Sequence, residues 1–168
     1  MGNVSLRWRM LVETSLLVIL IASASLLFGV IGTILAGILA LAMAATWRRP
    51  VMAADIDPQS VAVAEENAAI NGLAAWIRFR CSDGMSDREV RRAVPYDLIM
   101  ANILAGPLVA LSARLSACLA PRATLVLSGL LAQQESAVRN AYRRQGLSLR
   151  KRIALDGWHT LVMARRFQ

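Results

Sequence analysis

The chain has 168 residues and a mass of 18.2 kDa, a length that suits one domain with a substantial core. Hydrophobic residues make up 57% of it and charged residues only 18%, which excludes an intrinsically disordered chain, a collagen-like repeat and a disulfide-rich secreted scaffold. Nineteen basic against eleven acidic side chains give a net charge of +8, and eighteen of the basic ones are Arg. This charge fits an anionic partner such as RNA or an anionic membrane face, but the scattered Arg residues fit a GC-rich genome equally well.

The N-terminal part of the chain is almost wholly apolar. No charged side chain lies between Glu13 and Arg48, and residues 15–45 are long enough for a transmembrane helix. Basic residues flank this stretch at both ends, so they indicate no orientation in a membrane. A secretory signal peptide is a further reading of the same residues. The alternative is a strand buried on both faces, a tight turn and a buried helix, which in a parallel sheet also read as continuous apolar sequence.

From residue 49 onward, short strands alternate with amphipathic helices. The strands are expected at 51–54, 77–80, 96–101, 124–128, 147–152 and 158–164, and the helices at 58–71, 108–119 and 133–145. Pro58 opens the first of these helices and Asn71-Gly72 closes it, while Asp156-Gly157 provides a hairpin turn between the last two strands. This order predicts an α/β fold, a doubly wound and mostly parallel sheet with a C-terminal antiparallel hairpin.

The sequence contains few residues that could form a metal site or a catalytic triad. The two cysteines, Cys81 and Cys118, have neither metal-ligand nor redox spacing, and we interpret them as buried small hydrophobic residues. The single histidine, His159, leaves little with which to build a zinc site or a Ser-His-Asp triad. We therefore expect no metal.

Three polar positions follow the strands of the expected sheet, at the edge where open parallel sheets bind ligands. Asp55 follows the strand at 51–54, Asp83 follows the next strand, and Asn102 follows the apolar run that ends at Ala101. A carboxylate at the first position can accept hydrogen bonds from both hydroxyls of a ribose. Together with the turn after the first strand, these positions predict a pocket for a nucleoside cofactor.

Each of these positions also has a structural reading. Asp55 could cap the helix that follows, although Asp57 beside Pro58 is the better cap. Asp83 could belong to a solvated turn, and Asn102 could cap the next helix. Among the remaining residues, we interpret Trp158 and His159 as packing and surface residues, and the cluster 150–152 as a solvated strand edge rather than an RNA contact.

The sequence resembles the class I methyltransferases that use S-adenosyl-L-methionine and, among them, the ribosomal protein L11 methyltransferase family. The likeness extends from Gly37 to Arg166, and the residues from Asn102 to Leu108 are its most specific part. Its motifs are Ala54–Pro58, Ala64–Ala68, Asn71-Gly72, Tyr96–Leu108, Leu119–Pro121, Leu127–Leu131 and Gly157–Val162.

The resemblance implies a Rossmann-like methyltransferase domain at residues 37–168, preceded by an atypical apolar segment at residues 1–36. It implies a cytoplasmic enzyme that transfers methyl groups from S-adenosyl-L-methionine to lysine side chains or an α-amine of ribosomal protein L11. By position in the family's motifs, Asn102 is the implied catalytic residue, and the cofactor-binding residues are Gly32, Gly37, Asp55, Ile56, Asp83 and Asn102. Asp55 would bind the ribose, and Asp83 lies where the adenine is contacted.

Some features depart from the family pattern. Members read approximately Asp-x-Gly-x-Gly-x-Gly before the first helix, whereas residues 31–37 lack the acid and the middle glycines, so bulky side chains would crowd the cofactor. The family's additional N-terminal domain is not visible, and a shifted reading frame ahead of Gly37 would explain the abrupt start of the likeness. Two alternatives follow: a catalytically inactive remnant or binding module of the same fold, or a domain anchored in a membrane through residues 15–45.

The residues after Asn102 bear on the kind of substrate. Methyltransferases that act on nucleic-acid amino groups place Pro-Pro-aromatic after this asparagine, whereas Ile103-Leu104-Ala105 follows here. No ring is therefore available to stack on a flipped base. This favours a protein amine, with no direct recognition of nucleic acid.

Overall fold

The computed structural model describes residues 15–19 and 29–165, with side chains described from residue 37 onward. Within these residues the strands are β1 (Ser15–Ile19), β2 (Val51–Asp55), β3 (Ile77–Cys81), β4 (Tyr96–Asn102), β5 (Leu119–Leu131), β6 (Leu147–Leu155) and β7 (Trp158–Arg165). The helices are α2 (Gly29–Trp47), α3 (Pro58–Ile70), α4 (Arg88–Arg92), α5 (Ala105–Ala110), α6 (Ser112–Ala117) and α7 (Glu135–Arg144), with a short 3-10 helix, η1 (Ala132–Gln134), before α7.

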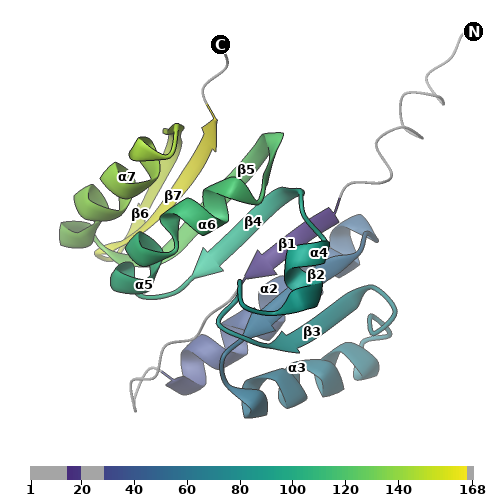
Figure 1. Ribbon diagram of the computed structural model, residues 1–168. Helices are drawn as coiled ribbons and strands as arrows, with labels where there is room; N and C mark the ends of the chain where they lie inside the picture. The colour runs from purple at the N-terminus through teal and green to yellow at the C-terminus, as the bar shows by residue number, and fades with distance from the viewer. Residues whose placement is uncertain (1–14, 20–28, 166–168) are drawn as a thin grey trace, which may run out of the picture.

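The strands form one sheet in the order β3-β2-β1-β4-β5-β7-β6 (Figure 1). Strands β1 to β5 are parallel, while β7 pairs antiparallel with both β5 and β6. Asp156 and Gly157, both at positive φ, form the turn between β6 and β7. The predicted fold class, a doubly wound and mostly parallel sheet with a C-terminal antiparallel hairpin, is confirmed.

Helices pack on both faces of the sheet, and each face has its own hydrophobic cluster. One cluster joins Val51 and Ala53 of β2 to small residues of α2 and α3, such as Ala40 and Ala64. The other joins the opposite face to helices α4 to α7 and contains the larger side chains Val90, Leu108, Leu115, Val138 and Tyr142. Alternate residues of β2 and of β4 thus enter different clusters, which fixes the face to which each residue of these two strands belongs.

The segment from β2 to β3 agrees closely with its prediction. Asp57 caps α3: its carboxylate accepts hydrogen bonds from the backbone N–H groups of Gln59 (3.1 Å) and Ser60 (3.2 Å) and from the Ser60 hydroxyl (2.6 Å). These bonds lower the pKa of the Asp57 carboxyl, and the Ser60 hydroxyl contributes most. The helix ends before Asn71, and Gly72 follows at a φ of +66°.

The region between residues 105 and 131 differs from its prediction. The expected helix at 108–119 is two short helices, and the first of them begins at Ala105. Pro107 is compatible with this start because it lies in the first turn, where a missing N–H costs no helical hydrogen bond. Strand β5 is also longer than expected at both ends. It begins at Leu119, which pairs with Tyr96, and it continues past Gly129 to Leu131.

At the N-terminus, the described residues match the reading of a strand followed by a helix. Strand β1 lies in the middle of the sheet between β2 and β4, and α2 packs against α3 and the sheet through Ala40, Met43 and Ala44. The expected turn between them falls at residues 20–28, outside the described residues. Within the part of the chain that the structure describes, no helix is long and apolar enough to cross a membrane.

The prediction for one cysteine is wrong. Cys81, at the end of β3, is exposed, because the chain leaves the sheet at this point, and its thiol lies 3.6 Å from the carbonyl oxygen of Ile56. Cys118 is half-buried, and burial raises the pKa of its thiol.

Candidate functional site

Asp55 and Asn102 lie at the same edge of the sheet and on the same face of it. Ile19 of β1 pairs with Ala54 on one side and with Ala101 on the other, so Asp55 and Asn102 share the next row. They are separated by two strand spacings, about 10 Å between Cα atoms. Asp55 alternates with Ala54 along β2, and Asn102 alternates with Ala101 along β4, which places both on the α2 and α3 side. The two residues therefore flank the carboxyl end of β1.

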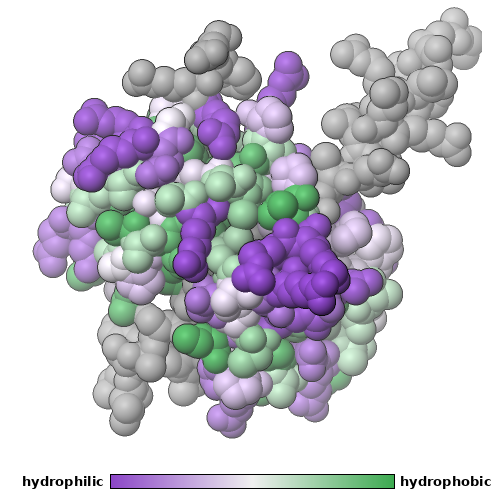
Figure 2. Space-filling view, in the orientation of Figure 1, coloured by the Kyte–Doolittle hydropathy of each residue, from purple (hydrophilic) through white to green (hydrophobic). Residues whose placement is uncertain are grey.

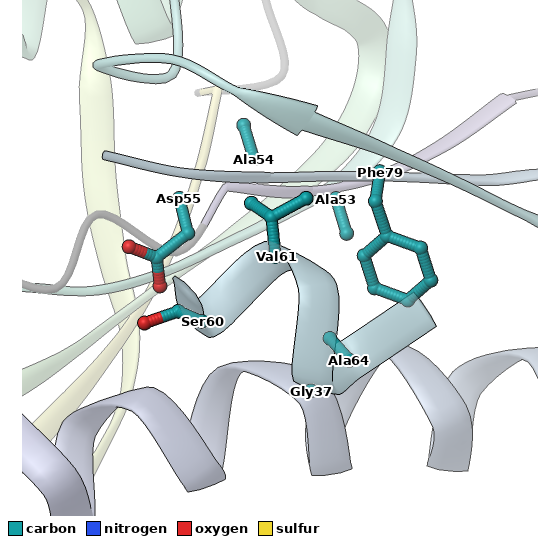
Figure 3. A pocket seen from close by; sticks show the side chains of 8 residues that line it. All are labelled: Gly37, Ala53, Ala54, Asp55, Ser60, Val61, Ala64 and Phe79. Carbon is teal, nitrogen blue, oxygen red and sulfur yellow. The ribbon is translucent and has the colours of Figure 1, made fainter. Parts of the chain in front are cut away.

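The carboxylate of Asp55 is buried, with 5% of the residue exposed. The carboxylate accepts a hydrogen bond from the backbone N–H of Asp57 at 2.9 Å. The backbone carbonyl oxygen of Asp55 accepts one from the backbone N–H of Ser82 at 2.7 Å. The side chain points off the sheet toward the start of α3 (Figure 3). Asp57, and not Asp55, is the N-cap residue of α3.

A small, mainly apolar hollow lies beside Asp55, between β2, β3, α2 and α3 (Figure 3). It is lined by Gly37, Ala53, Ala54, Asp55, Ser60, Val61, Ala64 and Phe79. Gly37 lines the hollow with its backbone. A Cβ atom at this position would lie 3.3 Å from the Cβ atom of Ala64. Gly32 and Gly37 both lie within α2 rather than in a loop before it, which differs from the arrangement that the resemblance implies. In this structure Gly37 is a point of close packing between α2 and α3.

Asp83 lies in the loop after β3, and the loop itself uses its carboxylate. Its Oδ1 atom accepts hydrogen bonds from the backbone N–H groups of Met85 (3.2 Å) and Ser86 (2.8 Å). Hydrogen bonds from Ser86 lower the pKa of the Asp83 carboxyl. This geometry supports the turn reading of Asp83, although the residue does lie at the same edge of the sheet as Asp55.

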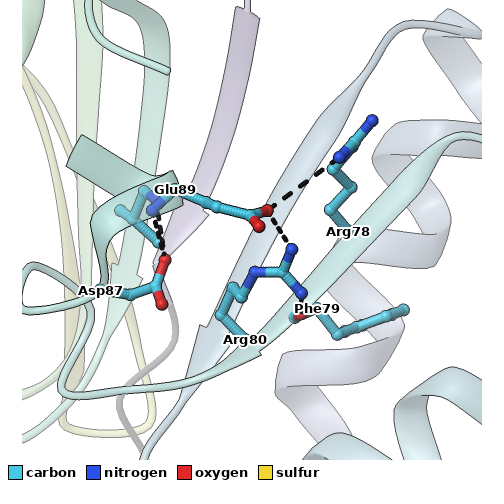
Figure 4. Close-up of polar contacts among 6 residues, drawn as sticks. Arg78, Phe79, Arg80, Asp87 and Glu89 are labelled. Carbon is cyan, nitrogen blue, oxygen red and sulfur yellow. Dashed lines mark hydrogen bonds and ion pairs between the residues drawn. The ribbon is translucent and has the colours of Figure 1, made fainter. Parts of the chain in front are cut away.

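The same loop leads into α4, whose start is fixed by a side-chain cap. The carboxylate of Asp87 accepts from the N–H groups of Glu89 (2.7 Å) and Val90 (3.0 Å). Glu89 pairs with Arg80 and lies 4.0 Å from Arg78 on β3 (Figure 4). The charged residues of α4 form a hydrophilic patch on the visible face of the molecule (Figure 2).

Asn102 lies against a glycine of the neighbouring strand. A Cβ atom on Gly129 would lie 2.9 Å from Asn102 Oδ1 and 3.2 Å from the carbonyl oxygen of Ile103. Ser128, the register partner of Asn102, has its hydroxyl 3.1 Å from that of Thr160 on β7. Gly129 was not among the predicted site residues. Its signal in the sequence is a glycine inside an apolar strand, which is typical of a bulge or a close backbone approach.

A second polar group lies further along this edge. Glu135, at the start of α7, is buried, and its Oε2 atom lies 2.6 Å from His159 Nδ1 and 3.5 Å from Arg152 Nη1. Its other oxygen lies 3.5 Å from Arg139. His159 thus takes part in a cluster of polar contacts around Glu135 that ties α7 to the β6–β7 hairpin. Trp158, beside it, is 43% exposed.

The arrangement suits a small polar ligand with an apolar ring. A buried carboxylate at the end of β2 can accept from hydroxyl groups, and the carboxamide of Asn102 can both donate and accept. Ile56, directly after Asp55, is 53% exposed and offers an apolar surface at the same edge. The carboxyl edge of a parallel sheet is where such folds bind nucleotides and related cofactors.

Comparisons with known proteins agree with this reading. The family model of ribosomal protein L11 methyltransferase matches residues 31–166. The ribosomal protein L11 methyltransferase of Rhodopseudomonas palustris is 46% identical over 131 residues, which are 78% of this chain and 44% of that protein. That of Bradyrhizobium diazoefficiens is 42% identical over 127 residues, 76% of this chain and 43% of that protein.

Among solved structures, the ribosomal protein L11 methylase of Lactobacillus delbrueckii subsp. bulgaricus superposes with a TM-score of 0.74 and 26% identity, covering 99% of this chain and 81% of that one. An RNA methyltransferase from Salinibacter ruber, solved with S-adenosyl-L-homocysteine, has a TM-score of 0.59 at 16% identity, covering 100% and 95% of the two chains, and shares the fold. The chain spans about half the length of the curated relatives it matches. It belongs to the ribosomal protein L11 methyltransferase family.

Proposed function

We propose that this chain binds S-adenosyl-L-methionine at the carboxyl edge of its sheet and transfers the methyl group to an amine of ribosomal protein L11. The observation that carries the proposal is the shared row of Asp55 and Asn102, on one face and on either side of the end of β1. Membership of the family supports the same reaction, because the relatives at 46% and 42% identity bear that name. We also propose a cytoplasmic location on this basis.

The side chains at this edge of the sheet fit the cofactor. Asp55 offers a buried carboxylate for the two ribose hydroxyls, and Ile56 offers an exposed apolar side chain for the adenine ring. Asp83 would act mainly through the loop that it holds, since its Oδ1 already accepts from two backbone N–H groups. The chemistry that the bound cofactor supplies is a methyl group on a sulfonium, which is transferred to a nucleophile by in-line displacement.

The protein has to position the acceptor rather than carry out acid–base chemistry. An amine must arrive deprotonated and aligned, so positioning and exclusion of water provide most of the rate. The side-chain oxygen of Asn102 can accept a hydrogen bond from the amine and so direct its lone pair. Asn102 lies on β4, whose carboxyl end is held between β1 and β5, so the carboxamide starts from a rigid element.

A protein amine fits the residues around Asn102 better than a nucleobase. Ile103 is buried and Leu104 is 49% exposed, so no aromatic ring follows the asparagine to stack on a base. Leu104, Leu131 and Trp158 are exposed apolar side chains. Because Leu131 and Trp158 are register partners, they form a shared apolar surface at the end of β5 and the start of β7, suited to a protein surface.

A second function, a binding module of the same fold without catalysis, is favoured by one observation. Gly32 and Gly37 lie inside α2, so neither supplies a flexible backbone at the end of β1. Residues 20–28, which follow β1, contain no glycine. A chain that binds the cofactor but leaves ribosomal protein L11 unmethylated would match this reading.

The two functions are separated by following radiolabelled methyl from S-adenosyl-L-methionine into purified ribosomal protein L11. The proposed enzyme labels the protein, and Asn102→Ala lowers the rate by about 100-fold, the effect expected when a reacting group is misplaced. Asn140→Ala, an exposed asparagine of α7, serves as the matched control and keeps the wild-type rate. Cofactor binding without label favours the binding module, and absence of both rejects the two functions together.

A further inference from the structure

We propose that Gly129 is a positioning residue: the space left by its missing side chain is the space that the Asn102 carboxamide occupies, and it holds that group in place for the acceptor amine. The inference rests on the proposed function for its chemical consequence. Its geometric part, the fit of Asn102 against Gly129, stands on the fold alone.

The first observation is the contact itself. A Cβ atom built on Gly129 would lie 2.9 Å from Asn102 Oδ1, closer than nonbonded carbon and oxygen atoms pack. It would also lie 3.2 Å from the carbonyl oxygen and 3.5 Å from the nitrogen of Ile103. Any side chain at position 129 would therefore push the Asn102 carboxamide away from β5.

The second observation is the bulge that brings Gly129 to this place. Leu127 pairs with Leu161 and Leu130 with His159, so two residues of β5, Ser128 and Gly129, oppose one residue of β7. Gly129 has a φ of +79°, in the left-handed region that favours glycine. Bulges beside functional sites redirect a side chain or the backbone, and Gly129 of this bulge follows Ser128, the register partner of Asn102.

The third observation is what fixes the bulge. The hydroxyl of Ser128 lies 3.1 Å from that of Thr160, the single β7 residue opposite the bulge. Leu127, Leu130 and Leu161, on either side of the bulge, are fully buried. The glycine is therefore held by packing on both sides, and Asn102 meets a rigid surface.

Two reasons for a glycine at position 129 have to be separated by experiment, namely its positive φ and its contact with Asn102. Gly146 provides the control, because its φ is +81° and a Cβ atom there would have nothing within 4 Å. Gly129→Ala combines backbone strain with the contact, whereas Gly146→Ala has the strain alone. In an Asn102→Ala background, the closest contact of the added methyl group is gone.

The experiment is a double-mutant cycle on the full chain, with the variants Gly129→Ala, Asn102→Ala and both together, and with Gly146→Ala as control. The thermal unfolding midpoint is measured first, and methyl transfer to ribosomal protein L11 second. We expect Gly129→Ala to lower the midpoint about twice as far as Gly146→Ala. Asn102→Ala should remove most of this excess, because only the longer contact with the Ile103 carbonyl oxygen, at 3.2 Å, remains. In transfer, Gly129→Ala and Asn102→Ala each lower kcat by about 100-fold, and the double variant is no slower than Asn102→Ala.

Additive effects in either measurement overturn the proposal, because they mean that Gly129 does not act through Asn102. If Gly129→Ala alone does not fold, the double variant should fold, and failure of the double variant also overturns it. A wild-type chain without methyl transfer would reject the proposed function. The unfolding cycle would still decide the Gly129 contact, so the two failures are distinguishable.

Discussion

Asp55 and Asn102 stand in one row of the sheet, each one residue beyond the pairing of its strand with Ile19 of β1. One ligand can contact both side chains only because they share a face, since a carboxylate and a carboxamide on opposite faces of the sheet could not bind one ligand. The structure places both on the α2 and α3 side, and Figure 3 shows the Asp55 carboxylate directed to that side.

The exposed apolar side chain of Ile56 is expected to contribute to cofactor affinity and not to stability. Ile56→Ala should weaken binding of S-adenosyl-L-methionine about fivefold, equivalent to about 1 kcal/mol of lost apolar contact. Ile70→Ala provides the matched control, because Ile70 is 74% exposed at the far end of α3. Calorimetric titration measures both, and equal affinities for the two variants would remove Ile56 from the site.

Close packing of Gly37 on Ala64 predicts a loss of stability when the glycine is enlarged. Gly37→Val should lower the free energy of unfolding by about 1–3 kcal/mol, because α2 and α3 must move apart. Gly106→Val introduces the same side chain where a Cβ atom has nothing within 4 Å, and should cost less than about 1 kcal/mol. Urea unfolding compares them. Equal losses would show that Gly37 does not act through α3.

The cap of α3 predicts a pH dependence of stability. The pKa of Asp57 is lowered from 3.8 by the Ser60 hydroxyl and then by the Gln59 N–H, so its ionised form is favoured in the folded state. The stabilisation is complete above pH 3.8 and is lost as the pH falls through the lowered folded-state pKa. The wild-type advantage in Tm over Asp57→Asn should therefore be constant at neutral pH and vanish in acid. A difference that persists in strong acid would contradict this assignment.

At the start of α4, the cap should matter more than the ion pair beside it. Asp87→Ala removes two N–H···O bonds and should cost about 1 kcal/mol. Glu89→Gln removes the contact with Arg80, but Arg80 and Glu89 have side-chain exposures of 32% and 46%, so the loss should stay below about 0.5 kcal/mol at physiological salt (Figure 4). Chemical unfolding measures the free energy of unfolding of both variants. A larger loss for Glu89→Gln than for Asp87→Ala would show that the ion pair matters more than the cap.

The sequence predicted those elements whose ends are marked by local signals. Asp57-Pro58 and Asn71-Gly72 bound α3, and Asp156-Gly157 forms the β6–β7 turn, because each depends on the conformational preferences of its own residues. The positions of Asp55 and Asn102 at strand ends followed from the same local patterns. Their shared face required the pairing of β2 and β4 with β1.

What the sequence could not provide depends on contacts between distant segments. The helix expected at 108–119 begins at Ala105 and is divided into α5 and α6. The residues around Gly129 in the sequence do not indicate its contact with Asn102. The two residues are 27 positions apart and meet only through the pairing of β4 with β5. Glu135 likewise meets His159 only because α7 packs on the hairpin. The apolar stretch at 15–45 allowed a membrane helix or a strand and helix, since both tolerate a continuous apolar sequence.

Calorimetric titration of S-adenosyl-L-methionine into the wild-type chain and Asp55→Asn measures whether the Asp55 carboxylate binds the ribose of the cofactor. A carboxylate that binds the ribose hydroxyls contributes about 1.5–3 kcal/mol, so the variant should bind about 10- to 100-fold more weakly. Asp156→Asn, in the hairpin turn, should bind as the wild type does. No binding by the wild-type chain at millimolar cofactor, or equal affinities for wild type and Asp55→Asn, would show that Asp55 does not bind the ribose of this cofactor.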